Sequence, residues 1–175
     1  MRLIVTKNAR DKLASAIDVS GVNPENLLKM REDLVSVTNK ILPDEKLNTI
    51  AYGCTSGTIA IGEDSIKKKI LSVKPDCYVT NPITSTIKAF KLMNIKKIAL
   101  FTPYPDAVNK TILEYFTKKD ITVSSFASLH LNLDSEFANV DPNYILEISS
   151  TLEVKIYRET EKSQARVSHW LVHHW

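Results

Sequence analysis

The chain alternates short apolar runs with longer amphipathic segments, and this alternation most constrains its fold. Runs typical of buried strands lie at 48–52, 77–80, 97–101 and 121–126, and helical patterns lie at 24–42, 57–71, 84–93, 107–119 and from 142 onward. Strands separated by helices of this length predict parallel pairing with right-handed crossovers. We therefore expect an α/β protein of three layers, with a parallel sheet and flanking helices.

The first predicted helix carries a clear start signal and an apolar stripe. Asn23 is an N-cap residue followed by Pro24 at the first helical position, and Pro43 closes the pattern. Apolar residues recur between these limits at helical spacing, and we expect them to face the core. They are Leu27, Met30, Leu34, Val37 and Ile41.

Length and charge limit the classes of function. With 175 residues, 43% of them hydrophobic and 25% charged, the chain is long enough for a packed core and is not disordered by composition. A net charge of +3 provides no strong electrostatic footprint for nucleic acid. The sequence shows neither a signal-peptide pattern nor an apolar run long enough to cross a bilayer. We therefore expect a cytoplasmic protein with no nucleic-acid or membrane partner.

A cysteine stands at one of the strand-to-helix junctions. Residues 51–57 read Ala-Tyr-Gly-Cys-Thr-Ser-Gly, so Cys54 falls between the predicted strand and the following helix. A helix N-terminus lowers the pKa of a thiol and binds carboxylate oxygens, which makes Cys54 a candidate catalytic thiolate for a small acid. A lone cysteine is also commonly a small buried packing residue, and the local pattern leaves both interpretations open.

Tyr104 occupies a comparable position in the second half of the chain. Residues 101–104 read Phe-Thr-Pro-Tyr and follow a predicted strand. In open parallel α/β sheets ligands bind at the carboxyl ends of the strands, so Cys54 and Tyr104 are expected to converge there. The alternative is a turn tyrosine packed beside Pro103 and Pro105 with no ligand.

Together with Asn-Pro-Glu-Asn-Leu at 23–27 and Val108-Asn109, these two segments resemble the aspartate/glutamate racemase superfamily. The resemblance extends over about residues 22–148 and is nearest to the branch of maleate cis-trans isomerases, arylmalonate decarboxylases and proteins of ectoine utilisation. It implies two pseudo-symmetric α/β halves, no cofactor or metal, and a small carboxylate substrate held in the cleft between the halves. It also suggests a homodimer.

The resemblance implies roles for particular residues. Cys54 matches the first of two catalytic cysteines, and its thiolate would remove an α-proton or add to a double bond. Thr55, Ser56 and Tyr104 match positions that bind a substrate carboxylate, and Asn109 joins them as a substrate-binding residue.

The chain departs from the family pattern at both ends. A second cysteine should follow a strand beyond the helix that begins near 142, but no cysteine follows Cys77. Cys77 falls in the predicted strand 77–80, where we expect a buried packing residue. The family opens with a strand and a substrate-binding loop of the type Pro-Ser-x-Asn, whereas residues 1–8 contain Leu3-Ile4-Val5 and no such loop. Racemisation, which needs a donor on each face of the substrate, is therefore expected to be lost.

The composition changes after residue 150. In residues 153–175 the apolar residues do not recur with a clear helical or strand period. This stretch contains both tryptophans and three of the four histidines, His169, His173 and His174. Metal binding is one interpretation, but no acidic or cysteine ligand cluster accompanies these histidines. A frameshift, an altered gene end or a misassembled gene would explain both the change and the missing cysteine. We expect a first α/β half at 1–90, an incomplete second half at 91–150 and a divergent, mobile tail at 151–175.

Two functions follow as hypotheses. The first is a cofactor-independent isomerase, racemase or decarboxylase that acts on a small carboxylic or dicarboxylic acid such as maleate through Cys54. The second is a catalytically inactive homologue that at most binds small carboxylates, and without a second cysteine we expect negligible racemase or isomerase turnover. A general cysteine hydrolase is disfavoured because His130 is isolated in the sequence and is expected to be a loop or core residue.

Overall fold

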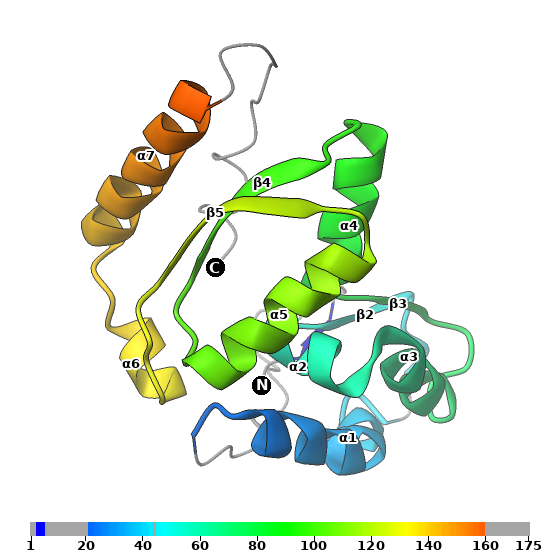
Figure 1. Ribbon diagram of the computed structural model, residues 1–175. Coiled ribbons are helices and arrows are strands. Elements are labelled where there is room, and N and C mark those ends of the chain that lie inside the picture. Colours follow the sequence, from blue (N-terminus) through cyan, green and yellow to red (C-terminus); the bar gives the residue numbers. More distant parts are fainter. Residues whose placement is uncertain (1–2, 6–20, 44, 160–175) are drawn as a thin grey trace. The chain divides into compact units, whose positions relative to one another are not determined.

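The computed structural model describes residues 3–5, 21–43 and 45–159. The chain divides into two compact units, Met1–Ala89 and Phe90–Trp175, and each unit has a sheet of its own (Figure 1). The residues at the division belong to helix α4 (Pro82–Leu92), which begins in the first unit and ends in the second.

The sheet of the first unit has three strands in the order β1 (Leu3–Val5), β2 (Thr49–Tyr52) and β3 (Tyr78–Thr80). Strands β2 and β3 are parallel, as predicted, whereas β1 joins β2 in the antiparallel direction. Ile50 and Tyr52 of the central strand are fully buried. The carboxyl ends of β2 and β3 therefore lie at the same edge of the sheet.

Helix α1 (Pro24–Asn39) packs against α2 (Thr55–Ile61) and α3 (Glu63–Leu71). Its predicted start is confirmed, because the Asn23 side chain accepts the Asn26 N–H at 2.9 Å, and the predicted apolar stripe is buried. It ends before residue 42, where the sequence pattern extended it, because Leu42 has a φ of 42° and precedes a proline. The ammonium of Lys74 donates to three carbonyls of this turn, those of Leu42, Pro43 and Glu45, at 2.8 to 3.1 Å.

One glycine divides the helix that the sequence predicted at 57–71. Gly62 has a φ of 88°, a backbone conformation that residues with a side chain rarely adopt. It ends α2, and α3 starts at the next residue. The predicted single helix is therefore two short helices, and α2 is a separate element attached directly to the Cys54 segment.

The second unit is built on two parallel strands, β4 (Lys97–Thr102) and β5 (Thr122–Ser128), joined by helix α5 (Asp106–Lys118). Helices α5 and α7 (Pro142–Glu159) pack against this pair and lie on different sides of it in Figure 1. Buried apolar side chains from β4 and α5 make the core, and Phe116 also meets the ring of Phe90 at 6.5 Å. The α/β class with parallel strands and flanking helices is confirmed.

Two features of the second unit differ from the expectation. A short helix, α6 (Asp134–Ala138), was not predicted. Helix α7 continues through Ser150 to Glu159, and Leu152 is buried, so the helix extends past the point where the composition changes. Residues 160–175, which include His169, His173 and His174, lie outside the described residues, and the predictions made for them stay predictions.

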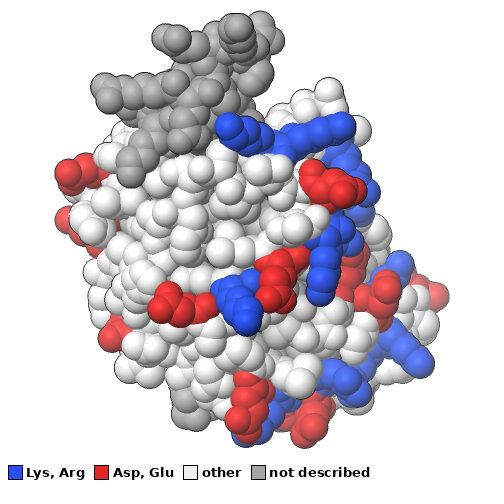
Figure 2. Space-filling view, in the orientation of Figure 1, with Lys and Arg blue, Asp and Glu red and all other residues white. Residues whose placement is uncertain are grey.

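Basic and acidic side chains are mixed on the face of the protein drawn in Figure 2. Within the described part of the chain, no helix has the length and apolar character that a bilayer-spanning segment needs.

Candidate active site

Cys54 lies at the predicted strand-to-helix junction in the first unit. Strand β2 ends at Tyr52, and Cys54 is the N-cap of α2, with an extended backbone conformation. Its Sγ atom accepts the Gly57 N–H at 3.2 Å, and the Ser56 hydroxyl lies 3.7 Å from the same sulfur. The side chain is half-buried. A hydrogen bond donated to sulfur stabilises a thiolate more than a neutral thiol, which suits a nucleophile.

The hydroxyl residues beside Cys54 have different surroundings. Thr55 is half-buried and begins α2, whereas Ser56 is buried. The Thr58 hydroxyl donates to the Cys54 carbonyl at 2.6 Å and ties the first turn of α2 to the end of the loop. The junction is therefore held by its own polar groups, and Thr55 is the more accessible of the two predicted carboxylate-binding hydroxyls.

Tyr52 and Gly57 belong to the site although the sequence patterns did not single them out. Tyr52 has 0% exposure, and its hydroxyl makes no hydrogen bond to any described residue. A Cβ atom on Gly57 would lie 2.6 Å from that hydroxyl and 2.9 Å from Cys54 Sγ, so both atoms crowd the space left by the missing side chain. Burial and, second, the charge of Cys54 hold the pKa of the Tyr52 phenol far above its ordinary value. A glycine in the first turn of a helix often marks a position where other atoms come close to the backbone. Gly57 is therefore the sequence signal that could have indicated the crowding by the Tyr52 hydroxyl and the Cys54 sulfur.

A second polar segment follows β3 at the same sheet edge. The Asn81 side chain is buried and accepts the Thr84 N–H at 2.8 Å, and the hydroxyls of Thr80 and Ser85 lie 3.2 Å apart. The Thr84 hydroxyl is buried without a hydrogen-bond partner in the described part of the chain. In the sequence the threonines and serine of this segment resemble ordinary helix-start residues, and no site was predicted there.

Cys77 lies at the opposite edge of the same sheet. It immediately precedes β3, which begins one residue later than the predicted strand 77–80, whereas Cys54 follows the carboxyl end of the parallel strand β2. Its side chain is buried, and burial raises the pKa of its thiol. Cys77 is therefore a packing residue, as expected, and does not lie beside Cys54.

In the second unit a buried polar network holds the loop that carries Tyr104. The Asn109 amide donates to the Tyr104 carbonyl at 2.6 Å and to the Ser128 hydroxyl at 3.0 Å, while its oxygen accepts from the Thr102 hydroxyl at 2.6 Å. Ser128 also donates to the Tyr104 carbonyl at 2.7 Å. The network links the ends of β4 and β5 to the first turns of α5. Thr102 and Ser128 were not predicted as members of the site.

The Tyr104 ring itself is buried and lies edge-on to Phe137 of α6 at 5.6 Å between centroids. Because Cys54 and Tyr104 belong to different units, their predicted convergence stays a prediction.

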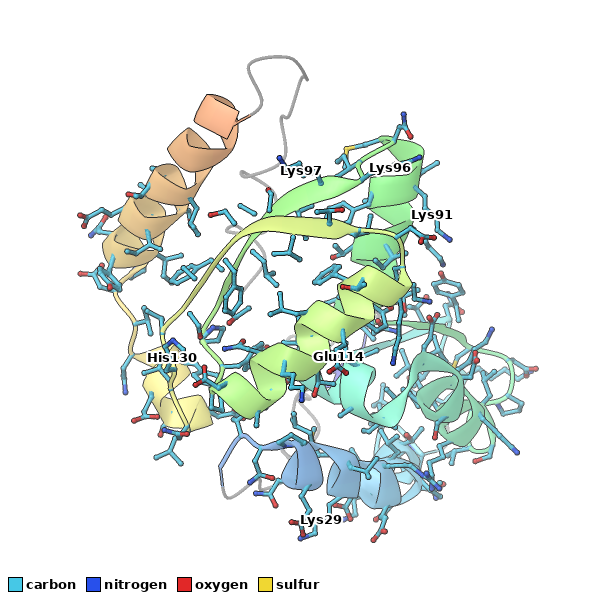
Figure 3. All side chains as sticks on the ribbon, viewed as in Figure 1. Lys29, Lys91, Lys96, Lys97, Glu114 and His130 are labelled. Atoms are coloured by element: carbon cyan, nitrogen blue, oxygen red, sulfur yellow. The ribbon has the colours of Figure 1, made fainter. Side chains whose placement is uncertain are left out.

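His130, which is isolated in the sequence, lies beside an acidic residue in the structure. Its Nδ1 lies 2.9 Å from Asp106 Oδ1 at the start of α5, and both side chains are exposed. Figure 3 labels His130 on the segment that leads from β5 to α6, so the predicted loop position is confirmed. The described residues contain no group of three histidine, cysteine or acidic side chains placed to hold a metal ion.

Similarity to known proteins agrees with this arrangement. The maleate isomerase of Geobacillus stearothermophilus is 26% identical over 148 residues, which are 81% of this chain and 59% of that protein. A liganded arylmalonate decarboxylase mutant superimposes with a TM-score of 0.70 at 19% identity, over 86% of this chain and 63% of the other. A Nocardia farcinica maleate cis-trans isomerase mutant with a covalently bound succinylcysteine intermediate gives a TM-score of 0.69 at 16% identity, over 78% of this chain and 58% of the other. No family model matches the chain.

The chain is an α/β protein whose fold matches that of maleate isomerases and arylmalonate decarboxylases. In sequence it is similar to two curated maleate isomerases, at 26% and 25% identity. The chain spans 59% and 55% of the length of the two curated maleate isomerases that it matches.

Proposed function

We propose that this chain carries the Cys54 half of a cofactor-independent enzyme that acts on a small carboxylic or dicarboxylic acid such as maleate. One observation carries the proposal: a half-exposed cysteine sulfur accepts a backbone N–H at the carboxyl end of a parallel strand. Ligands bind at this edge in open α/β sheets. The proposed nucleophile is therefore Cys54.

Thiolate addition followed by elimination suits an unsaturated diacid. The Cys54 sulfur would bond to one carbon of the double bond, and the π electrons would move to the adjacent carbon and its carboxylate. Rotation about the resulting single bond and loss of the thiolate would restore the double bond in the trans form without any net co-reactant. The succinylcysteine intermediate of the Nocardia farcinica enzyme supports this type of chemistry. In a racemase the corresponding step is proton removal next to a carboxylate, and in a decarboxylase it is loss of CO2 followed by protonation of the same carbon.

Thr55, Ser56 and Tyr104 are the proposed carboxylate-binding residues, through hydroxyl groups and the N–H groups near Thr55. Asn109 has its polar atoms engaged with Thr102, Tyr104 and Ser128. We therefore propose that Asn109 supports substrate binding by fixing the Tyr104 loop.

Binding without turnover is the second candidate. Cys77 is the only other cysteine of the 175 residues, and it lies at the opposite edge of the sheet of the first unit. A reaction that needs a thiol on each face of the substrate has no second thiol in this chain. A one-cysteine addition and elimination has no such requirement.

The test measures binding and turnover separately. NMR with maleate follows conversion to the trans acid, and α-proton exchange with aspartate follows racemase chemistry. Turnover that disappears in Cys54→Ser and persists in Cys77→Ser would support the enzyme. A melting temperature raised by maleate, malonate or aspartate without turnover would support the binding protein.

Tyr104→Phe tests the carboxylate site. Loss of one hydrogen bond should weaken the ligand-induced stabilisation by about 0.5–1.5 kcal/mol. Tyr144→Phe, which removes the same atom from an exposed tyrosine of α7, is the matched control. The absence of any shift at millimolar dicarboxylate would contradict both candidates.

We also propose a cytoplasmic location and a homodimer. A catalytic thiolate suits a reducing compartment, and the dimer follows the family resemblance. Light scattering on the purified chain measures the oligomeric state.

A further inference from the structure

The hydroxyl of Tyr52 is buried in the core of the first unit, where it makes no hydrogen bond to the described part of the chain. The side chain is completely buried on the central strand β2, and its oxygen makes no hydrogen bond to a described residue. Buried polar groups without a partner are rare because they lose hydrogen bonds to water without replacement. Phenylalanine would fill the same space without that cost. The hydroxyl therefore calls for an explanation beyond packing.

The surroundings of Gly57 place the Tyr52 hydroxyl near the Cys54 sulfur. The space where a Gly57 side chain would start lies 2.6 Å from the Tyr52 hydroxyl and 2.9 Å from Cys54 Sγ. The same Gly57 donates its N–H to that sulfur at 3.2 Å. The phenol and the sulfur thus approach each other across a residue that has no side chain to separate them.

Resting on the proposed role of Cys54, we propose that Tyr52 is a positioning residue whose hydroxyl donates a hydrogen bond to the Cys54 thiolate. The thiol releases its proton to solvent, and the sulfur anion is then held by the Gly57 N–H and the Tyr52 O–H. A neutral thiol is a weak acceptor, whereas hydrogen bonds to a charged acceptor are shorter and stronger. Ionisation of Cys54 therefore gives the Tyr52 hydroxyl a strong hydrogen-bond acceptor.

The electrostatic surroundings keep the phenol a donor. Burial first, and then the charge of Cys54, raise the pKa of Tyr52, so its proton stays in place wherever a thiol titrates. Cys54 is the charged group of the described residues that contributes to this shift. Among the helices that pack with α2, the charged residues at the start of α3, Glu63 and Asp64, are exposed. Those on the body of α1 are also exposed, namely Glu25, Lys29, Arg31, Glu32 and Asp33.

The experiment compares the unmodified chain with Tyr52→Phe. Alkylation by iodoacetamide is followed across the pH range in which thiols titrate, and peptide mass spectrometry reads Cys54 and Cys77 separately in each sample. Cys77 is the internal reference, and Tyr144→Phe is the control for loss of a tyrosine hydroxyl elsewhere. Circular dichroism melting reports whether each variant folds.

Tyr52→Phe should raise the midpoint of Cys54 alkylation by about one pH unit, which leaves roughly one tenth of the thiolate below the midpoint. The Cys77 profile should not move. The melting temperature should stay the same or rise, because an unpartnered buried hydroxyl has been removed. A lowered melting temperature with an unchanged midpoint would show a purely structural role and would overturn the inference.

Should Tyr52→Phe fail to fold, the ionisation of Cys54 in the unmodified chain provides a second test. The ultraviolet tyrosine difference spectrum should report a change in phenol hydrogen bonding at the same midpoint as Cys54 alkylation, and Cys54→Ser should abolish it. A spectrum that does not change with Cys54 ionisation would also overturn the inference. Both measurements omit substrate, so their failure is distinct from a failure of the carboxylate-binding test.

Discussion

Replacing Gly57 with alanine tests the close approach of Tyr52 and Cys54 directly. Glycine to alanine in a helix normally stabilises by about 1 kcal/mol. Here the new Cβ would lie 2.6 Å from a fully buried hydroxyl and 2.9 Å from a sulfur that is hydrogen-bonded to Gly57 itself. Forcing atoms apart in a packed interior costs about 1–3 kcal/mol. We expect a net destabilisation of up to about 2 kcal/mol, or up to about 8 °C in Tm.

A double-mutant cycle identifies the obstructing atom. Tyr52→Phe removes the nearer of the two atoms, so the double variant should be more stable than the sum of the single effects predicts. The coupling free energy should be about 0.5–1.5 kcal/mol. Urea unfolding followed by circular dichroism gives the free energy of unfolding of the parent, both single variants and the double variant. A second cycle, with Cys54→Ala in place of Tyr52→Phe, tests the contact with the Cys54 sulfur in the same way.

A higher unfolding temperature for Gly57→Ala than for the parent would refute the packing argument. Replacing a helical glycine with alanine raises stability when there is open space for the new methyl group. Strict additivity with Tyr52→Phe would show that the phenol oxygen does not limit the space beside Gly57. Either result would also remove the geometric basis of the proposed hydrogen bond to the thiolate.

Three further measurements examine the site and the fold. Iodoacetamide should alkylate Cys54 faster than Cys77 at neutral pH, because Cys54 is half-exposed whereas burial raises the pKa of the Cys77 thiol; equal or reversed rates would contradict Cys54 as the nucleophile. Asn109→Ala should lower the free energy of unfolding by about 2–4 kcal/mol because its buried partners lose their hydrogen bonds, and unchanged stability would argue against the network. Lys74→Met should cost about 1–2 kcal/mol by leaving the carbonyls after α1 without their charged donor, whereas the exposed Lys68→Met should cost almost nothing. Thermal and urea unfolding decide both stability predictions.

Much of the fold could be predicted because its signals are local. The Asn23 cap and the apolar stripe of α1 depend on spacing within one segment, and both are confirmed. The break at Gly62 and the helix α6 were missed, since the amphipathic pattern runs across the glycine and α6 is too short to show a period. The antiparallel pairing of β1 was missed as well, because a run of three apolar residues does not specify the direction of its partner strand.

By itself, the sequence determined the order of strands and helices, the parallel class and the position of Cys54 between β2 and α2, because these follow from residues close together in the chain. Only the tertiary structure decided what surrounds them. Pairing of β2 with β3 puts Cys54 and Cys77 at opposite edges of one sheet, and pairing of β4 with β5 brings Ser128 to Asn109. Burial leaves the Tyr52 hydroxyl beside the Cys54 sulfur without a partner in the described structure. A hydrogen-bond partner is set by strand register and packing between distant segments, and no local pattern encodes it.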